Sequence, residues 1–278
     1  MNVGAILFAL GAAVLFGIGS AAEQSQTKRE KGTRTLDPRL LARLLRRPLW
    51  LVGSVAAILG TVLQALALRI GALALVEPLL LAGVFVAIPL SAAFVQQRPN
   101  PRDFLVVALG VVGLTAFLVA AAPQAGLSQA DNAAWFPVII GIAALFTLCL
   151  VLAWRIPGAT RGVLLGIGAG LLYGFDASLL KAVTAQLGDG PRALFTNWHV
   201  YALTIVGIVA VMLHQDAFQS GRIAGPLTTI AVVDPIVGVA IGVLVYQEKL
   251  SLHGFRLPVV VAAAALLGYV LWLARRSR

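Results

Sequence analysis

Three acidic residues lie inside apolar stretches of the chain, where a charge is expensive. Glu77, Asp176 and Asp234 each fall within a window of about twenty mostly hydrophobic residues, the length that crosses a bilayer. A charged side chain at the bilayer centre costs about 2.5 to 3.5 kcal/mol on insertion scales. We therefore expect these carboxyl groups to face a hydrated cavity, to find partners or to bind protons inside the protein. They are candidates for binding a substrate or an ion.

Two of these acids directly precede a proline. Glu77-Pro78 and Asp234-Pro235 are separated by an offset of 157 residues. A proline inside a helix leaves a carbonyl without its amide partner, and at membrane depth that carbonyl needs another donor or a water-lined cavity. Interrupted helices in matching halves mark central transport sites, so both prolines are candidate helix breaks. A plain kink, in which the acid only satisfies the freed backbone groups, is the structural alternative for each pair. For Asp176 the alternative is a buried, hydrogen-bonded acid that locks two helices together.

Polar residues near these acids could add contacts to a substrate. Tyr173 lies one turn before Asp176 and could hydrogen-bond to it. Gln64 and Gln215, offset by 151 residues, are further candidates. Lys181 lies near an outer helix end, where its side chain could reach the membrane interface. The predicted binding residues are therefore acids and neutral polar groups.

The apolar stretches that carry these residues predict an all-α integral membrane protein with about nine transmembrane helices in an inverted-repeat bundle. Of the 278 residues, 60% are hydrophobic and 12% are charged, and the mean hydropathy is +0.94. A soluble domain has about 25% charged residues, so a soluble fold is excluded. The windows lie at 3–22, 48–68, 72–96, 104–122, 135–154, 162–182, 198–214, 223–246 and 255–274.

Membrane topology explains the net charge of +10 without nucleic acid. Eight Lys and Arg residues lie within 28–47, after the first window, which predicts that this loop is cytoplasmic. Alternation then puts the N-terminus and the loop 123–134 outside and the C-terminus in the cytoplasm, in the plasma membrane. Within the basic segment 23–47, residues 38–47 place leucines on one helix face and arginines on the other. This pattern predicts an amphipathic helix on the membrane surface, with lipids as partners.

Similar segments indicate an internal repeat. Residues 9–20 resemble 166–177, and small residues spaced by four recur in both, as in helix pairs that pack closely. The predicted helix-packing residues are Gly17, Gly166, Gly170 and Gly174. We expect a first repeat at 1–122, a linking helix within 123–160 and a second repeat at 161–278. Because five windows separate equivalent helices, the second copy would insert with the opposite orientation.

Taken together, the sequence resembles the drug/metabolite transporter superfamily (EamA-like) and, within it, the NIPA-like branch. The resemblance covers almost the whole chain, including GTVLQALALRIGALALVEPLLLAGVFVAIPLSAAF at 60–94 and TTIAVVDPIVGVAIGVLVYQEKL at 228–250. In that superfamily a proline and a glutamate bracket the end of such a helix, as Pro235 and Glu248 do here, whereas Gln97 departs from the glutamate common in the first half. The resemblance implies a transporter. The NIPA-like branch implies transport of magnesium or another divalent cation.

These observations predict a secondary transporter that moves a small solute by alternating access and is coupled to protons or cations. A NIPA-like magnesium transporter is the alternative, and a structural membrane subunit without transport is a third hypothesis. No HExxH, P-loop or Gly-x-Ser-x-Gly motif occurs, so we expect neither an enzyme nor a cofactor. Cys149 is the single cysteine, and the three histidines lie at separate helix ends, so no zinc site is predicted, while other metals are left open. The expected partners are the solute or cation, a coupling proton and lipids, and a homodimer is kept open.

Overall fold

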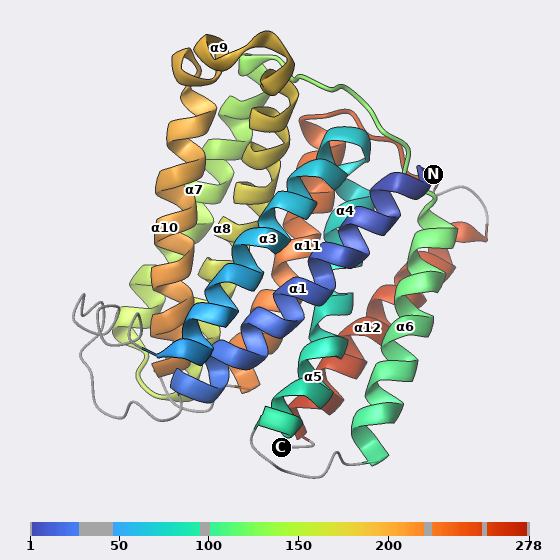
Figure 1. Ribbon diagram of the computed structural model, residues 1–278, viewed down its shortest axis with the longest axis vertical. Coiled ribbons are helices and arrows are strands. Elements are labelled where there is room, and N and C mark those ends of the chain that lie inside the picture. Colours follow the sequence, from blue (N-terminus) through green and yellow to red (C-terminus); the bar gives the residue numbers. More distant parts are fainter. Residues whose placement is uncertain (1, 28–46, 95–100, 220–223, 252–254, 277–278) are drawn as a thin grey trace. The chain divides into compact units, whose positions relative to one another are not determined.

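The computed structural model describes residues 2–27, 47–94, 101–219, 224–251 and 255–276, and these residues are almost entirely helical (Figure 1). The described part of the chain contains no strand beyond an isolated β-bridge between Gln124 and Lys249. The elements are α1 (Val3–Thr27), α3 (Pro48–Ile70), α4 (Leu73–Leu80), α5 (Ala82–Phe94), α6 (Pro101–Ala121), α7 (Asn132–Arg155), α8 (Ala159–Gln186), the 3-10 turn η1 (Leu187–Asp189), α9 (Pro191–Thr196), α10 (Trp198–Gln219), α11 (Ala224–Leu244) and α12 (Arg256–Arg276). The chain is an all-α membrane protein, as predicted.

Five of these helices are long and apolar enough to cross a membrane: α1, α3, α7, α8 and α10. Four further apolar segments are shorter, at Leu73–Ala87, Ala108–Ala121, Thr229–Leu244 and Arg256–Tyr269. Each expected window therefore coincides with a helical region. The count of nine spans stays a prediction, because only five helices meet the length and hydropathy expected of a span within the described residues.

Helix α7 shows why these helices belong in lipid. Its side chains include large exposed apolar groups such as Phe136, Ile140, Leu148 and Trp154. An exposed apolar face of this kind would promote aggregation in water, but it is the expected surface of a helix that contacts acyl chains. The helix begins at the N-cap residue Asp131, whose side chain accepts a hydrogen bond from Ala133 N at 3.3 Å.

The third expected window, 72–96, forms two helices instead of one. Helix α4 ends at Leu80, two residues after Pro78, and α5 begins at Ala82. The connection is a tight turn, in which Leu81 N donates to Pro78 O at 3.2 Å and Val84 N donates to Leu81 O at 3.0 Å. The interruption predicted near Pro78 therefore occurs just after that proline.

The other predicted break is not present as an interruption. Pro235 lies inside α11, which runs without a gap from Ala224 to Leu244. A proline removes one amide hydrogen bond, and the remaining bonds of the helix hold it together here. The predicted amphipathic helix at 38–47 falls almost wholly outside the described residues. Positions 23–27, expected in a polar linker, instead extend α1 to Thr27.

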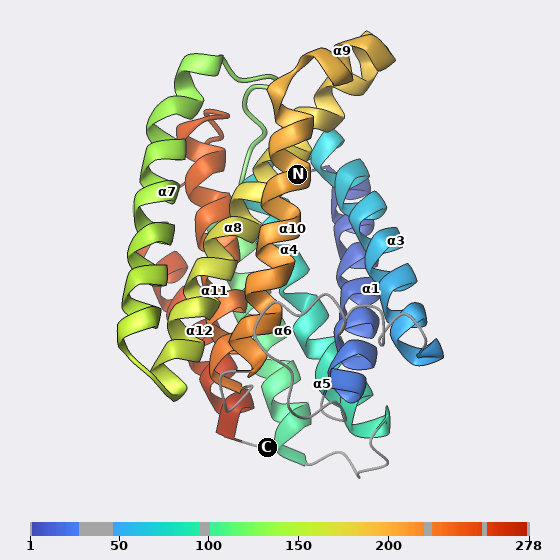
Figure 2. The same cartoon turned by 90° about the vertical axis from the view of Figure 1, so that its left-hand side faces the viewer.

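The chain divides into two compact units. The first unit comprises Met1–Asn2, Leu68–Glu77 and Ala122–Ser251. Its centre is α8, which packs against α7, α10 and α11 (Figures 1 and 2). The apolar core of this packing consists of Ala153, Leu165, Ala169, Leu213, Ala217 and Ile230. Small side chains on α8 let its three neighbours approach closely, which agrees with the mixed small and apolar composition of this helix.

The second unit comprises Val3–Ala67, Pro78–Ala121 and Leu252–Arg278. In it, α1 packs against α5 and α6 packs against α12. A glycine makes the first contact close: a Cβ placed on Gly17 would lie 2.6 Å from Gly83 O and 2.9 Å from Val86 Cβ. The two helix backbones touch at this point, as in other small-residue helix pairs.

The packing of α1 on α5 recurs within the first unit, between α8 and α11. A Cβ placed on Gly174 would lie 2.6 Å from Asp234 O and 2.7 Å from Val237 Cβ. The first helices of the two pairs are related by 157 residues, from Gly17 to Gly174, but the second helices by 151, from Gly83 to Asp234. The recurrence agrees with an internal duplication. It also corrects one expected match, because an offset of 151 does not pair Glu77-Pro78 with Asp234-Pro235. The orientation of the copies stays a prediction.

Candidate functional site

The three acids singled out from the sequence meet inside the first unit. Glu77 on α4 is 2% exposed, and its side chain lies within hydrogen-bonding reach of the Asp234 carboxyl on α11. Asp176 on α8 is close enough to Asp234 for their charges to interact. Three helices thus contribute one acid each to what we call the acid cluster: Glu77, Asp176 and Asp234. Their role in binding a substrate or ion stays a prediction.

Two glycines make room for the acid cluster. A Cβ placed on Gly238, one turn after Asp234 on α11, would lie 2.5 Å from Glu77 Cγ and 3.0 Å from Glu77 Cβ. On α10, a Cβ placed on Gly207 would lie 3.3 Å from Asp176 Oδ1. Any larger side chain at Gly238 would displace Glu77, because these separations are below van der Waals contact. The cluster therefore depends on backbone that carries no side chain.

Two oxygen atoms of the acid cluster have no hydrogen-bond donor among the described residues. Asp176 Oδ1 and Asp234 Oδ1 are buried and accept no hydrogen bond from any residue in the described part of the chain. A hydrogen bond between two carboxyl groups, such as Glu77 and Asp234, requires a proton on one of them. Closely spaced buried carboxyl groups cannot all ionise without a compensating proton, cation or donor.

Tyr173 on α8 has a hydrogen-bond partner on another helix that the sequence did not indicate. Its hydroxyl group lies 3.0 Å from His214 Nδ1 on α10, and the two rings meet edge to face with their centroids 5.8 Å apart. Local spacing on α8 could not indicate this contact with a ring nitrogen of another helix. Tyr173 thus joins α8 to α10, and its bond to Asp176 stays a prediction.

The two glutamines predicted as polar contacts lie in different places. Gln215 follows His214 on α10 in the first unit, and its Oε1 is buried without a hydrogen-bond partner among the described residues. Gln64 lies on α3 in the second unit and is also buried. The helix-packing glycines behave as expected at Gly17, Gly170 and Gly174, which contact neighbouring helices. Gly166 lies in the same helix, α8.

Lys181 belongs to a buried ion pair that the sequence did not predict. It is 4% exposed, and its Nζ lies 2.5 Å from Glu248 Oε1 in a buried ion pair. The same Nζ donates to Gly71 O at 3.2 Å and lies 4.8 Å from the centre of the Tyr246 ring. A buried carboxylate, a carbonyl and an aromatic face satisfy the ammonium group, so it has no need of water.

Glu248 connects this ion pair to the start of α4. Its Oε1 accepts a hydrogen bond from Leu73 N at 2.6 Å, and its Oε2 accepts one from Ala74 N at 2.8 Å. A Cβ placed on Gly242 would lie 2.5 Å from Glu248 Oε2, so this glycine makes room for the carboxylate. Sequence reasoning named Glu248 but did not connect it with Lys181. The spacing of Gly238 and Gly242 was a visible signal of close packing on α11.

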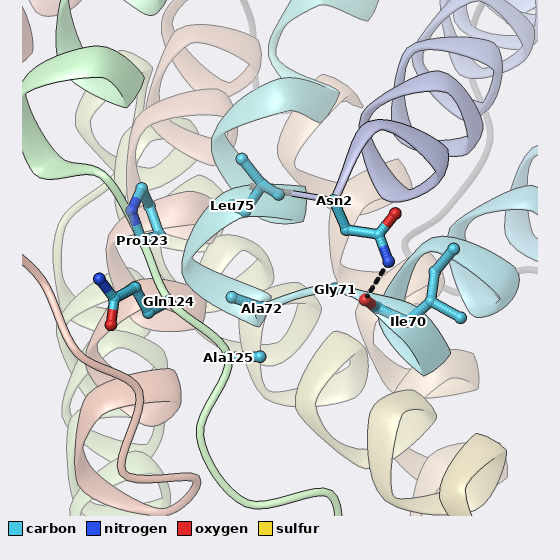
Figure 3. A pocket seen from close by; sticks show the side chains of 8 residues that line it. All are labelled: Asn2, Ile70, Gly71, Ala72, Leu75, Pro123, Gln124 and Ala125. Carbon is cyan, nitrogen blue, oxygen red and sulfur yellow. Dashed lines mark hydrogen bonds between the residues drawn. The ribbon is translucent and has the colours of Figure 1, made fainter.

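A cavity of about 210 Å³ lies beside this network in the first unit. Figure 3 shows its walls, which are formed by Asn2, Ile70, Gly71, Ala72, Leu75, Pro123, Gln124 and Ala125. Asn2 Nδ2 donates to Ile70 O at 3.1 Å, so the start of the chain is tied to the end of α3. Gly71 links the two features, because it lines the cavity and its carbonyl oxygen accepts a hydrogen bond from Lys181 Nζ.

Segments that the predicted topology assigns to one side of the membrane meet at this end of the first unit. Gln124 N donates to Lys249 O at 2.9 Å, and Lys249 N donates to Gln124 O at 3.2 Å. The loop 123–134 thus joins the loop that follows α11, close to Asn2. Their common location agrees with the predicted alternation of the loops. Which side of the membrane they face stays a prediction.

Comparisons with known proteins give one relative of unknown function. No family model matches the chain, and no solved structure matches it. The chain is 29% identical over 250 residues to an uncharacterized protein of Corynebacterium glutamicum, an alignment that covers 89% of this chain and 86% of the relative. The resemblance to drug/metabolite transporters therefore stays an expectation from the residues themselves.

Proposed function

We propose that this protein is a multi-pass secondary transporter that moves a small solute by alternating access and is coupled to protons or cations. The observation that supports it is the acid cluster, to which α4, α8 and α11 each contribute one carboxyl group. Buried acids within transmembrane helices mark proton relays and ion paths. We place the protein in the plasma membrane, with the N-terminus outside and the C-terminus in the cytoplasm.

The short helix α4 could couple protonation of the acid cluster to a conformational change. Glu77 lies on an eight-residue helix that ends at Leu80, so this acid is carried by an interrupted segment rather than by a continuous span. In secondary transporters, interrupted helices carry the binding groups at the membrane middle. Gain or loss of a proton by the cluster would change which packing of α4 against α11 is preferred, and coupling requires such a differential interaction.

A magnesium transporter, the function implied by the NIPA-like resemblance, is the second candidate. Magnesium keeps several waters and needs only one or two carboxylates, which the acid cluster could supply. In the described ranges, however, no three His, Cys, Asp or Glu residues are arranged to hold a metal ion. We therefore favour an organic solute. A structural subunit, alone or as a homodimer, would need no proton or cation at the cluster.

Transport by reconstituted protein tests the proposal. Proteoliposomes with an entrapped pH dye would be challenged with magnesium and with a panel of amino acids, nucleosides and organic cations. We expect one solute class to drive proton flux or to be driven by a pH gradient. The triple variant Glu77→Gln, Asp176→Asn, Asp234→Asn should abolish that coupling, because it removes every titratable group of the cluster.

The matched control is Asp131→Asn. Asp131 is an exposed N-cap residue, and asparagine caps a helix about as well as aspartate, so flux should be unchanged. Undiminished coupled flux in the triple variant would contradict the assignment of the cluster. Uptake of magnesium alone, with no response to any organic solute, would favour the second candidate.

A further inference from the structure

The buried ion pair of Lys181 and Glu248 lies outside the acid cluster, and the proposed transport chemistry does not use it. Both side chains are almost fully buried, at 4% and 3% exposure. Burial of two charges carries a large desolvation penalty, which only good geometry and additional hydrogen bonds offset. Here Glu248 accepts two backbone hydrogen bonds besides the ion pair, and Lys181 also contacts Gly71 O and the Tyr246 ring.

The hydrogen bonds to Glu248 compensate for a missing local cap on α4. The first amides of a helix have no partner within the helix, and Ser, Thr, Asp or Asn usually caps them. The residues before Leu73 are Gly71 and Ala72, which carry no capping side chain. Glu248, 175 residues from Leu73, supplies the carboxylate instead. A helix of eight residues is unstable by itself, so its start is set by this tertiary contact.

The contact that fixes the start of α4 also orients Glu77. Leu73 and Glu77 are four residues apart and therefore lie on the same face of the helix. The facing helix, α11, repeats this spacing: Asp234 and Gly238 meet Glu77, and Gly242 meets Glu248. One face of α11 thus receives both glutamates, one turn apart.

We propose that Lys181 and Glu248 are positioning residues that hold the first turn of α4 so that Glu77 faces Asp234. This proposal rests on the proposed function, because the transport chemistry is what would require Glu77 at this position. The donors around residue 248 require an anion: two backbone amides and an ammonium group point at it. Lys181 in turn holds Gly71, the residue at the turn into α4.

A disulfide between α4 and α11 reports the position of residue 77 without any transport measurement. In a Cys149→Ala background, the pair Glu77→Cys and Gly238→Cys brings two Cβ atoms to about the separation that a disulfide needs, after a small shift. We expect rapid oxidation with Lys181 and Glu248 intact. Oxidation should be severalfold slower in Glu248→Ala and Lys181→Met, and close to the original rate in Lys181→Arg, which keeps the charge.

Two further variants separate positioning from general stability. The exchange Lys181→Glu with Glu248→Lys restores an ion pair but points an ammonium group at the amides of Leu73 and Ala74, so slow oxidation should persist. Lys249→Gln, at an exposed neighbouring position, should oxidise at the original rate. If Glu248→Ala does not yield folded protein, Glu248→Gln tests the same point, because it keeps an acceptor for the amides but removes the charge.

Transport provides the second readout. In the proteoliposome assay with Cys149 and the acid cluster restored, Lys181→Met and Glu248→Gln should change the pH profile of flux, and Lys181→Arg should restore it. Fast disulfide formation in Glu248→Ala, Glu248→Gln and Lys181→Met would overturn the positioning role. Slow oxidation in these variants, together with an absence of coupled flux in the original protein, would retain the positioning of α4 and reject the proposed function.

Discussion

At the residue scale, Glu77 depends on the absence of a side chain opposite it. It lies on the short helix α4 and is 2% exposed, and it occupies the space beside Gly238 that a methyl group would fill. A buried acid in this position has little freedom to relax, because its Cβ and Cγ atoms are both in contact with the α11 backbone. The geometry of the acid cluster is therefore sensitive to a single added carbon.

Gly238→Ala tests this sensitivity. Its Cβ would lie 2.5 Å from Glu77 Cγ, so we expect overpacking that destabilises the protein by about 1–3 kcal/mol. Coupled flux should fall as well, since Glu77 would move away from Asp234. Thermal unfolding in detergent and the liposome assay measure the two effects.

Gly141→Ala is the matched control for this substitution. Gly141 lies inside α7, and a Cβ there meets no other atom within 4 Å. Alanine should be tolerated or slightly stabilising at this position, because it favours the helix by about 1 kcal/mol over glycine. Equal behaviour of the two variants would show that Gly238 does not constrain Glu77.

At the element scale, the same close contact occurs twice. Helix α1 meets α5 at Gly17, and α8 meets α11 at Gly174, with the glycine of each pair against a backbone carbonyl and a valine. The same close contact between two helices thus occurs in both units. The sequence comparison indicated the stripe of small residues on the first helix of each pair. For the matches that follow it gave two offsets, 157 and 151 residues, and only the second agrees with the packing of α5 and α11.

Parallel substitutions test whether the two contacts are equivalent. In Gly17→Ala and Gly174→Ala the new Cβ would lie 2.6 Å from a backbone carbonyl, which cannot rotate away. We expect each variant to lower the free energy of unfolding by about 1–3 kcal/mol through overpacking. Gly268→Ala on α12, where a Cβ meets nothing within 4 Å, should be tolerated or slightly stabilising, as at Gly141. Thermal unfolding of the three variants in the same detergent measures these effects. Unchanged stability in Gly17→Ala or Gly174→Ala would refute the close contact at that site.

At the scale of the whole molecule, the loops indicate how the chain is oriented in the membrane. The start of the chain, the loop after α6 and the loop after α11 meet at one end of the first unit. Basic residues concentrate in the loop after α1, which the positive-inside rule assigns to the cytoplasm. Together these observations predict that the joined loops face outward.

Cysteine labelling in intact cells tests that orientation. In a Cys149→Ala background, Ser128→Cys lies in an exposed part of the loop after α6, and Thr160→Cys lies at the exposed start of α8. A membrane-impermeant maleimide should label the first in intact cells and the second only after permeabilisation. The reverse pattern would show that the chain inserts with its N-terminus inside.

The sequence alone determined that the chain is helical, apolar and membrane-bound, and it identified the three buried acids. These properties follow from local windows, because the length of a span and the cost of a charge within it are set by neighbouring residues. Only the tertiary structure decided which groups meet. The partner of Lys181 is 67 residues away and the cap of α4 is 175 residues away. Tyr173 likewise bonds to another helix. Local spacing does not specify such contacts, which arise when α4, α8, α10 and α11 pack together.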